Sequence, residues 1–351
     1  MARWKLLIAA FTLVPVATSA NTIGTTNRPT STLPASTLPA RPQAVATVGT
    51  ASHAAAPTVQ AEPHVSVAEV HLAPTDAATN PGMGKPAMWV VRDADTTIYL
   101  LGTVHILPAQ TRWFNPTIRS ALTRADEMLT EIPDREMRAP SSTDLLIQRA
   151  LARDGVALSQ RLSAEQRALY RQALARLRLP NAMFERAEPW VPGFFMGFPT
   201  RGASRAHGVE TVLVAAATEQ RKRQFGLESV DLQLSYLDRL SEPAQIQLLM
   251  GASQSVLHRE ERFSDLVNAW AKGDVAAIAA VADEDRDNFR EFHDALLTNR
   301  NRNWAQWISM RIEEEGGTYF IAVGAAHLAG QDSVQHFLRE NHRLTAERIN
   351  Y

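Results

Sequence analysis

The sequence predicts an α/β fold: a central, mainly parallel or mixed sheet with helices on both faces and a helical insertion. Short runs rich in Val, Ile, Leu, Tyr and Phe alternate with longer stretches whose apolar residues recur at helical spacing. This alternation of strands and helices is typical of a mainly parallel or mixed sheet covered on both faces. Residues 141–180 show helical spacing and no strand pattern, so we expect a helical cap at about 138–205.

The first half of the folded part contains three expected strands and one expected helix before the cap. The strands are 88–91, 96–101 and 127–132, the last stopped by Pro133. Asn115-Pro116 opens the helix, because Pro is favoured in a first helical turn.

Beyond the cap, residues 189–199 form a dense apolar segment that we expect to be a loop. It either packs over the core or forms the wall of a pocket for an apolar or extended substrate. The elements expected after it are a helix at 208–221, a strand at 224–227, helices to about 315, a strand at 318–323, a helix at 333–340 and a strand at 343–349.

The N-terminus has the pattern of a secretory signal peptide. Arg3 and Lys5 precede a short apolar run, and small residues at 17–20 provide a cleavage site after Ala20. The run is too short for a typical membrane span, although an uncleaved anchor is the alternative. We therefore expect an exported protein, periplasmic or secreted, with no membrane span after removal of residues 1–20.

Residues 21–85 predict a disordered linker, because they are rich in Ala, Thr and Pro and contain no Phe, Trp or Tyr. Residues 86–351 have the composition of a folded domain. The net charge of −1 argues against nucleic acid as a partner. The chain has no Cys, so disulfides, thiolate nucleophiles and Cys-based metal sites are excluded.

Two segments share one pattern, an apolar strand followed by Gly-x-x-His. The first ends at His105 and the second at His327, and the motif occurs nowhere else in the chain. Ligands of open α/β sheets bind outside the carboxyl ends of strands, so both imidazoles are expected at that edge. The alternative for such a residue is a hydrogen-bonded cap without a catalytic role.

Glu131 and Glu228 also follow predicted strands, and each is a candidate carboxylate for the same edge. Two imidazoles and a carboxylate make either an acid–base set or a divalent metal site. The sequence has no Gly-x-Ser-x-Gly, His-Glu-x-x-His or P-loop motif, so the commonest hydrolase and nucleotide-binding signatures are missing.

The order of several short motifs resembles the TraB/GumN family, which includes the Tiki proteins. The resemblance covers about residues 86–351, and Glu210 stands where that pattern would have Asp. The matching pieces are Trp89-Val90-Val91, residues 99–105, Glu131, Pro189-Trp190, Gly208-Val209-Glu210, Gly226-Leu227-Glu228-Ser229 with Gln233, Arg300-Asn301 with Trp304, and residues 323–330.

The resemblance implies a metal-dependent hydrolase or protease in a fold related to erythromycin-esterase-like and haem-uptake-type proteins. His105, His327 and Glu131 would be the metal ligands and catalytic residues, with Glu228 the second choice of carboxylate. The metal would be Mn, Co, Fe or Zn. Arg300 and Asn301 would complete the site as a clamp on the substrate and a ligand. The substrate would be a peptide, an ester or a glycan-related compound.

Two further interpretations stay open. In a metal-free scheme one His is the general base, a glutamate orients it and an arginine stabilises the oxyanion. In the other, the protein is a non-catalytic binding or assembly factor, for example in envelope polysaccharide biosynthesis or export, and the site is a ligand pocket.

Overall fold

A computed structural model describes residues 82–196, 204–257, 260–283, 286–287, 289–314 and 316–351, all in one compact unit. The predicted signal peptide and the predicted linker up to residue 81 lie outside these residues. The folded part begins slightly before the expected boundary at residue 86. Gly84 N donates to Arg112 O (2.7 Å) and Lys85 N to Ala271 O (2.7 Å), which fixes both residues to the domain.

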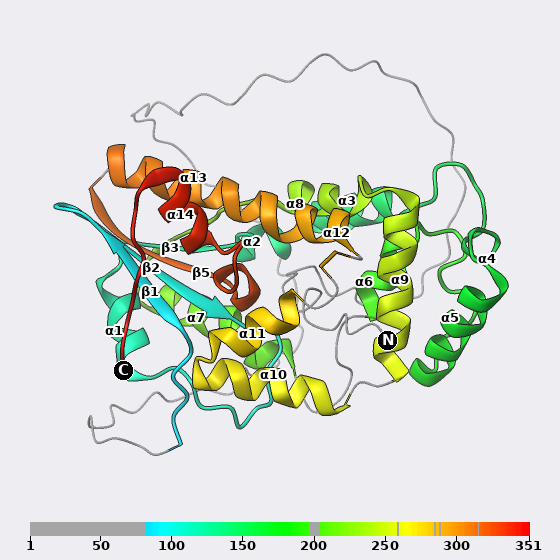
Figure 1. The fold of residues 1–351 in the computed structure, drawn as a ribbon, viewed down its shortest axis with the longest axis horizontal. Helices are drawn as coiled ribbons and strands as arrows, with labels where there is room; N and C mark the ends of the chain where they lie inside the picture. Colours follow the sequence, from blue (N-terminus) through cyan, green and yellow to red (C-terminus); the bar gives the residue numbers. More distant parts are fainter. Residues whose placement is uncertain (1–81, 197–203, 258–259, 284–285, 288, 315) are drawn as a thin grey trace, which may run out of the picture. The chain divides into compact units, whose positions relative to one another are not determined.

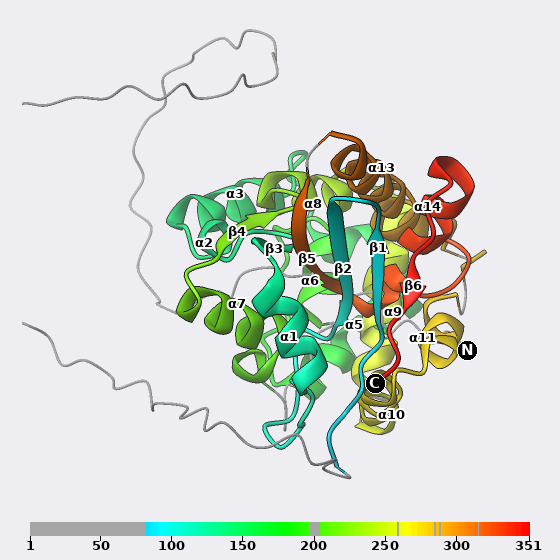
Figure 2. The same ribbon diagram turned by 90° about the vertical axis from the view of Figure 1, so that its left-hand side faces the viewer.

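The centre of the unit is a six-stranded mixed sheet in the order β4-β3-β5-β2-β1-β6 (Figures 1 and 2). The strands β4, β3, β5 and β2 are parallel, while β1 and β6 are antiparallel to their neighbours. The α/β class and the mixed sheet predicted from the sequence are confirmed. The strands are β1 Met88–Arg92, β2 Thr96–Thr103, β3 Glu127–Thr130, β4 Arg223–Gly226, β5 Gly317–Gly324 and β6 Glu347–Arg348.

Helices cover both faces of the sheet, as the alternation of strands and helices in the sequence predicts (Figure 1). On one face Met88, Met128 and Phe320 pack with residues of α1, α7, α10 and α11. On the other, Leu100, Leu129 and Ile321 pack with α13 and α14. The bounds are α1 Pro116–Arg124, α7 Val209–Glu219, α10 Glu260–Lys272, α11 Val275–Ala282, α13 Asn299–Glu314 and α14 Val334–His342.

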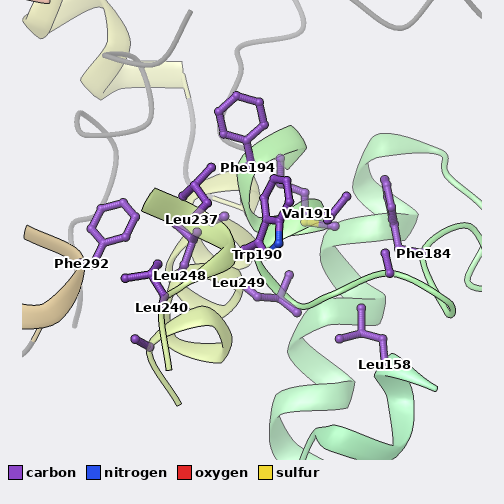
Figure 3. Packing of buried hydrophobic residues seen from close by; sticks show 14 of the residues in the cluster. Leu158, Phe184, Trp190, Val191, Phe194, Leu237, Leu240, Leu248, Leu249 and Phe292 are labelled. Atoms are coloured by element: carbon purple, nitrogen blue, oxygen red, sulfur yellow. The ribbon is translucent and has the colours of Figure 1, made fainter. Parts of the chain in front are cut away.

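A separate apolar cluster forms the core of the cap (Figure 3). The cap lies toward the carboxyl ends of the strands (Figure 1). The stretch 141–180, predicted to be helical throughout, contains three helices, and residues 151–157, 162–163 and 178–180 are not helical. The cluster also takes residues from α8, α9 and α12, beyond the expected bounds of 138–205. The helices are α3 Pro140–Ala150, α4 Leu158–Arg161, α5 Ala164–Leu177, α6 Trp190–Met196, α8 Val230–Asp238 and α9 Glu242–Leu257.

Several short helices and turns connect the longer elements. They are α2 Asp134–Met137, the 3₁₀ turns η2 Arg205–His207 and η4 Ala325–Leu328, α12 Arg290–His293, and a π-helical turn η3 Asp294–Thr298. The π-turn is continuous with α12 before it and α13 after it, so the three make one long helical segment in Figure 1.

Two local predictions differ from the structure. Residues 190–196 of the expected loop form helix α6, because Pro192 falls in its first turn, where a missing N–H costs nothing. Residues 197–199 of that segment lie outside the described residues. The last strand, expected at 343–349, is only β6, because Arg343 adopts a left-handed conformation (φ 58°) at the end of α14.

Candidate active site

Four neighbouring parallel strands end at one edge of the sheet, and a predicted site residue follows each end. Glu131 directly follows β3, His105 and Glu228 lie just beyond β2 and β4, and His327 lies in η4 after β5. All four residues are buried. The strand order therefore brings the predicted set to the edge where open α/β sheets bind ligands.

The two glutamates are held side by side by their own backbones. Glu228 N donates to Glu131 O (2.8 Å), which continues the pairing of β3 with β4 past the ends of the strands. Gly226 makes this approach possible, because a Cβ at that position would lie 2.3 Å from Pro133 Cδ. Any larger residue than glycine would push the Glu228 turn away from β3.

The guanidinium of Arg300 lies between the two carboxylates and His327. Arg300 Nη2 donates to Glu131 Oε2 (2.7 Å) and Glu228 Oε2 (2.9 Å), and Nε donates to both Glu228 oxygens (3.0 and 3.1 Å). Arg300 Nη1 donates to Leu296 O (3.1 Å) and lies 3.1 Å from His327 Nε2. The planar fork of arginine matches carboxylates in this way, which an ammonium group does not.

The π-turn η3 and the helix α13 present Arg300 to this centre. Leu296, whose carbonyl accepts from Arg300, belongs to η3, and π-turns often occur at functional sites. One turn after Arg300, Trp304 Nε1 donates to Glu228 Oε1 (3.1 Å), and its ring lies 4.7 Å from the Arg300 guanidinium carbon. Burial alone would lower the pKa of Arg300, but Glu228 and Glu131 raise it above its usual value, so the guanidinium stays charged.

Hydrogen bonds fix the protonation state of His327. Asn301 Nδ2 donates to Asp332 O (2.7 Å), which leaves Asn301 Oδ1 as an acceptor 2.5 Å from His327 Nδ1. Nδ1 therefore carries the hydrogen, and Nε2 keeps the lone pair that accepts from Arg300. Burial, followed by the charge of Arg300, lowers the pKa of His327 well below 6.5, so this imidazole is neutral.

His105 has a different carboxylate partner. Its Nδ1 lies 2.6 Å from Glu210 Oε1, and Thr103 Oγ1 also donates to that oxygen. Burial raises the pKa of Glu210, but His105 and Thr103 outweigh it and lower the pKa below its usual value. Because Glu210 is ionised and only accepts, this contact requires a hydrogen on Nδ1 of His105.

A glycine allows the first turn of α7 to reach the loop of His105. Val209 N donates to Val104 O (3.1 Å), and a Cβ on Gly208 would lie 2.0 Å from His105 O. The sequence Gly208-Val209-Glu210 thus combines close backbone approach with a carboxylate for His105. Glutamate in place of the expected aspartate leaves this contact intact.

The two Gly-x-x-His motifs lie against each other, since Thr103 pairs with Gly324 and a Cβ on Gly102 would lie 3.2 Å from Ala325 Cα. The partners of the two histidines are nevertheless distinct. His327 Nε2 lies 3.8 Å from Glu131 Oε1, whereas His105 is held by Glu210.

The two residues expected to bind substrate have protein partners in this arrangement. Arg300 uses its N–H groups on the carboxylates, Leu296 and His327, and Asn301 bridges His327 to Asp332. Their hydrogen bonds orient the other site residues, so direct contact with a substrate stays a prediction.

Sequence reasoning gave no role to Glu210 or Gln233, although both lie in matched motifs. Gln233 is completely buried, and its Nε2 donates to Glu131 Oε2 (3.0 Å). Their only sequence signal is a polar residue within a mainly apolar helix. That signal does not name the partner, since the partner is set by how α7 and α8 pack on the sheet.

A divalent metal does not fit the expected ligands as they are arranged. A metal needs lone pairs from its ligands, yet His327 Nε2 and Glu131 Oε2 face Arg300, and Glu131 Oε1 accepts from Gly324 N (2.8 Å). Within the described part of the chain, His, Asp and Glu side chains form no group of three placed to hold an ion. The predicted metal stays a prediction, and it would require these donors to move.

With the geometry described, sequence comparison decides the family. A family model described as "TraB/PrgY/gumN family" matches residues 87–343, which is most of the chain. The chain belongs to the TraB/PrgY/gumN family. It is also similar to a protein of Treponema pallidum (strain Nichols) named "Uncharacterized protein", with 23% identity over 279 residues, covering 73% of this chain and 81% of the relative.

Membership of the TraB/PrgY/gumN family confirms the resemblance seen in the sequence motifs, and the matched range contains all six predicted site residues. Among the helices that the structure describes, none combines the length and the apolar character needed to cross a bilayer.

Proposed function

We propose that this member of the TraB/PrgY/gumN family is a hydrolase in which His105, held by Glu210, transfers the protons. The observation that carries the proposal is the buried contact of His105 Nδ1 with an ionised Glu210 at the carboxyl edge of the parallel strands. A carboxylate that orients an imidazole and fixes its tautomer is the arrangement that makes histidine a general base.

In this proposal His105 Nε2 accepts a proton from water as the water oxygen attacks the substrate. The same proton then passes to the leaving group, so one water is consumed and His105 returns to its starting state. Glu210 stabilises the imidazolium that forms between the two steps. Glu131, Glu228, Arg300 and His327 form a hydrogen-bonded cluster at the same edge of the sheet.

Of the two hydrolytic schemes that the sequence allows, the donor geometry favours the one without a metal. The metal-dependent scheme with Mn, Co, Fe or Zn requires Arg300 and Gly324 N to release the lone pairs of His327 and Glu131. We also propose that the protein is exported and acts on a peptide, ester or glycan-related substrate. The basic and apolar start of residues 1–20 supports the export.

The test is a hydrolysis screen with peptides, carboxylic esters and oligosaccharides, comparing the wild type with His105→Gln and Glu210→Gln. Losing an oriented general base lowers kcat by about 10²- to 10⁴-fold, and we expect that loss in both variants. His207→Gln is the matched control, because His207 is an exposed histidine close to the Glu210 turn, and its activity should match the wild type.

Full activity in both His105→Gln and Glu210→Gln would contradict the assignment of these residues. If no substrate in any class is hydrolysed by the wild type, the binding or assembly factor becomes the better interpretation. Circular dichroism of each variant separates a loss of chemistry from a loss of fold.

A further inference from the structure

The place between Glu131, Glu228 and His327 is already taken by a positive charge. In a metal hydrolase such residues would give their lone pairs to an ion. Here the guanidinium of Arg300 contacts all three, and Arg300 is completely buried. The same acceptors cannot serve both cations at once.

The hydrogen-bonding capacity of Arg300 is fully used within the protein. A guanidinium has five N–H groups, one on Nε and two on each terminal nitrogen. The Nε hydrogen is shared by the two Glu228 oxygens, and the Nη2 hydrogens go to Glu131 and Glu228. The Nη1 hydrogens go to Leu296 O and His327 Nε2. Movement of the Arg300 side chain out of this site would therefore break hydrogen bonds at every one of its nitrogens.

The carboxylate oxygens of Glu131 and Glu228 also accept hydrogen bonds from other residues. Glu131 Oε2 accepts from Arg300 and from Gln233 Nε2, and Glu131 Oε1 accepts from Gly324 N. Glu228 Oε1 accepts from Trp304 as well as from Arg300. A metal entering this centre would therefore have to replace hydrogen bonds from three different elements, β5, α8 and α13.

Charge opposes the entry of a metal as well. Glu228 and Glu131 raise the pKa of Arg300, so the guanidinium stays charged. A divalent ion would have to enter beside a permanent cation in a buried site, where repulsion between like charges is weakly screened. The neutral His327 adds no negative charge that would offset this repulsion.

We propose that Arg300 is the built-in cation of this site, and that Glu131, Glu228 and His327 bind a divalent metal only when the Arg300 side chain is removed. This inference deepens the proposed function, because it assigns the metal-free scheme to the same edge of the sheet. This inference concerns metal binding alone. It can fail while the acid–base role of His105 holds, and it can hold while that role fails.

The experiment measures binding of Mn²⁺, Co²⁺ and Zn²⁺ to the untagged protein by isothermal titration calorimetry, with metal content after dialysis determined by mass spectrometry. We expect no binding by the wild type that depends on His327, and a new site of one equivalent in Arg300→Ala. The new site should disappear in the double variant Arg300→Ala, His327→Gln. Subtracting the metal binding of the double variant from that of Arg300→Ala removes the contribution of weak binding by histidines elsewhere in the chain.

Arg302→Ala is the control for removing a positive charge near the site. Arg302 is exposed on the same helix and bonds to Asn299 Oδ1 (3.3 Å), so its loss should not create a metal site. Arg300→Lys keeps the charge and should remain as free of metal as the wild type.

Binding of one equivalent by the wild type that is lost in His327→Gln overturns the proposal, and this arm does not require any Arg300 variant to fold. A folded Arg300→Ala protein that gains no metal site overturns it too. If Arg300→Ala does not fold, the wild-type measurement with its His327→Gln control still decides between a metal and the guanidinium.

Discussion

Glycines at the site matter because they have no Cβ, which lets neighbouring segments approach closely. Gly208, Gly226 and Gly102 each stand where a Cβ would lie 2.0 to 3.2 Å from an atom of a neighbouring segment. Each lies close to a charged or titratable site residue, respectively Glu210, Glu228 and His105. Each motif thus combines a titratable side chain with a glycine that lets its segment pack closely against a neighbouring segment.

We predict that Gly208→Ala destabilises the protein by about 1–3 kcal/mol, the usual cost of forcing an extra carbon into a packed place. The added Cβ would collide with the carbonyl oxygen of His105, a backbone atom that moves only if the loop after β2 moves. Urea unfolding measures this cost. Gly82→Ala is the control, because nothing lies within 4 Å of a Cβ there, and it should change the stability little.

The strand-end residues His105, His327, Glu131 and Glu228 could be predicted because each lies at the end of a segment with a strand pattern. Parallel strands bring their carboxyl ends to one edge of a sheet. The pairing of His105 with Glu210 and the central place of Arg300 could not be predicted. They depend on how α7 and α13 dock against that edge, which no local pattern encodes.

At the scale of elements, helix α6 differs from the loop that we expected at residues 189–199. Pro192 does not prevent this helix, because Pro is tolerated in a first turn. Gly193 serves a close helix contact instead, because a Cβ there would lie 3.0 Å from Leu249 N in α9. Trp190 is completely buried among cap residues (Figure 3), which supports packing over the core for that residue.

Trp190→Ala should therefore lower the free energy of unfolding by about 3–5 kcal/mol, as large-to-small substitutions of buried aromatic residues do. Phe225→Ala is the comparison, since Phe225 is an aromatic residue with 38% of its surface exposed. We expect that change to have a much smaller effect in the same urea titration. Equal effects of the two substitutions would show that α6 does not anchor the cap.

For the whole molecule, the buried ionisable groups make stability depend on pH. Burial and Arg300 lower the pKa of His327 well below its usual value, and burial and Arg286 lower the pKa of His293, so both bind protons less readily in the folded protein than in the unfolded chain. Glu210 also has a lowered pKa, but its ordinary value of 4.5 places its effect at more acidic pH. His327 and His293 therefore each contribute a loss of stability as the pH falls below the ordinary pKa of histidine.

Below about pH 6.5, the ordinary pKa of histidine, the unfolded chain takes up protons that the folded protein refuses. The free energy of unfolding should therefore be constant just above pH 7 and fall as the pH drops from 6.5 toward 5. The limiting slope is about 1.4 kcal/mol per pH unit for each histidine. Urea unfolding at half-unit pH steps measures it.

The variant His327→Asn should remove one histidine's share of this slope, whatever its effect on the absolute stability, because the slope counts only protons. His207→Gln, at an exposed position, should keep the wild-type slope. A slope that His327→Asn leaves unchanged would mean that His327 is charged in the folded protein. Its Nε2 would then carry a hydrogen and could not accept from Arg300, so the hydrogen bonding of the whole centre would have to differ from the arrangement described.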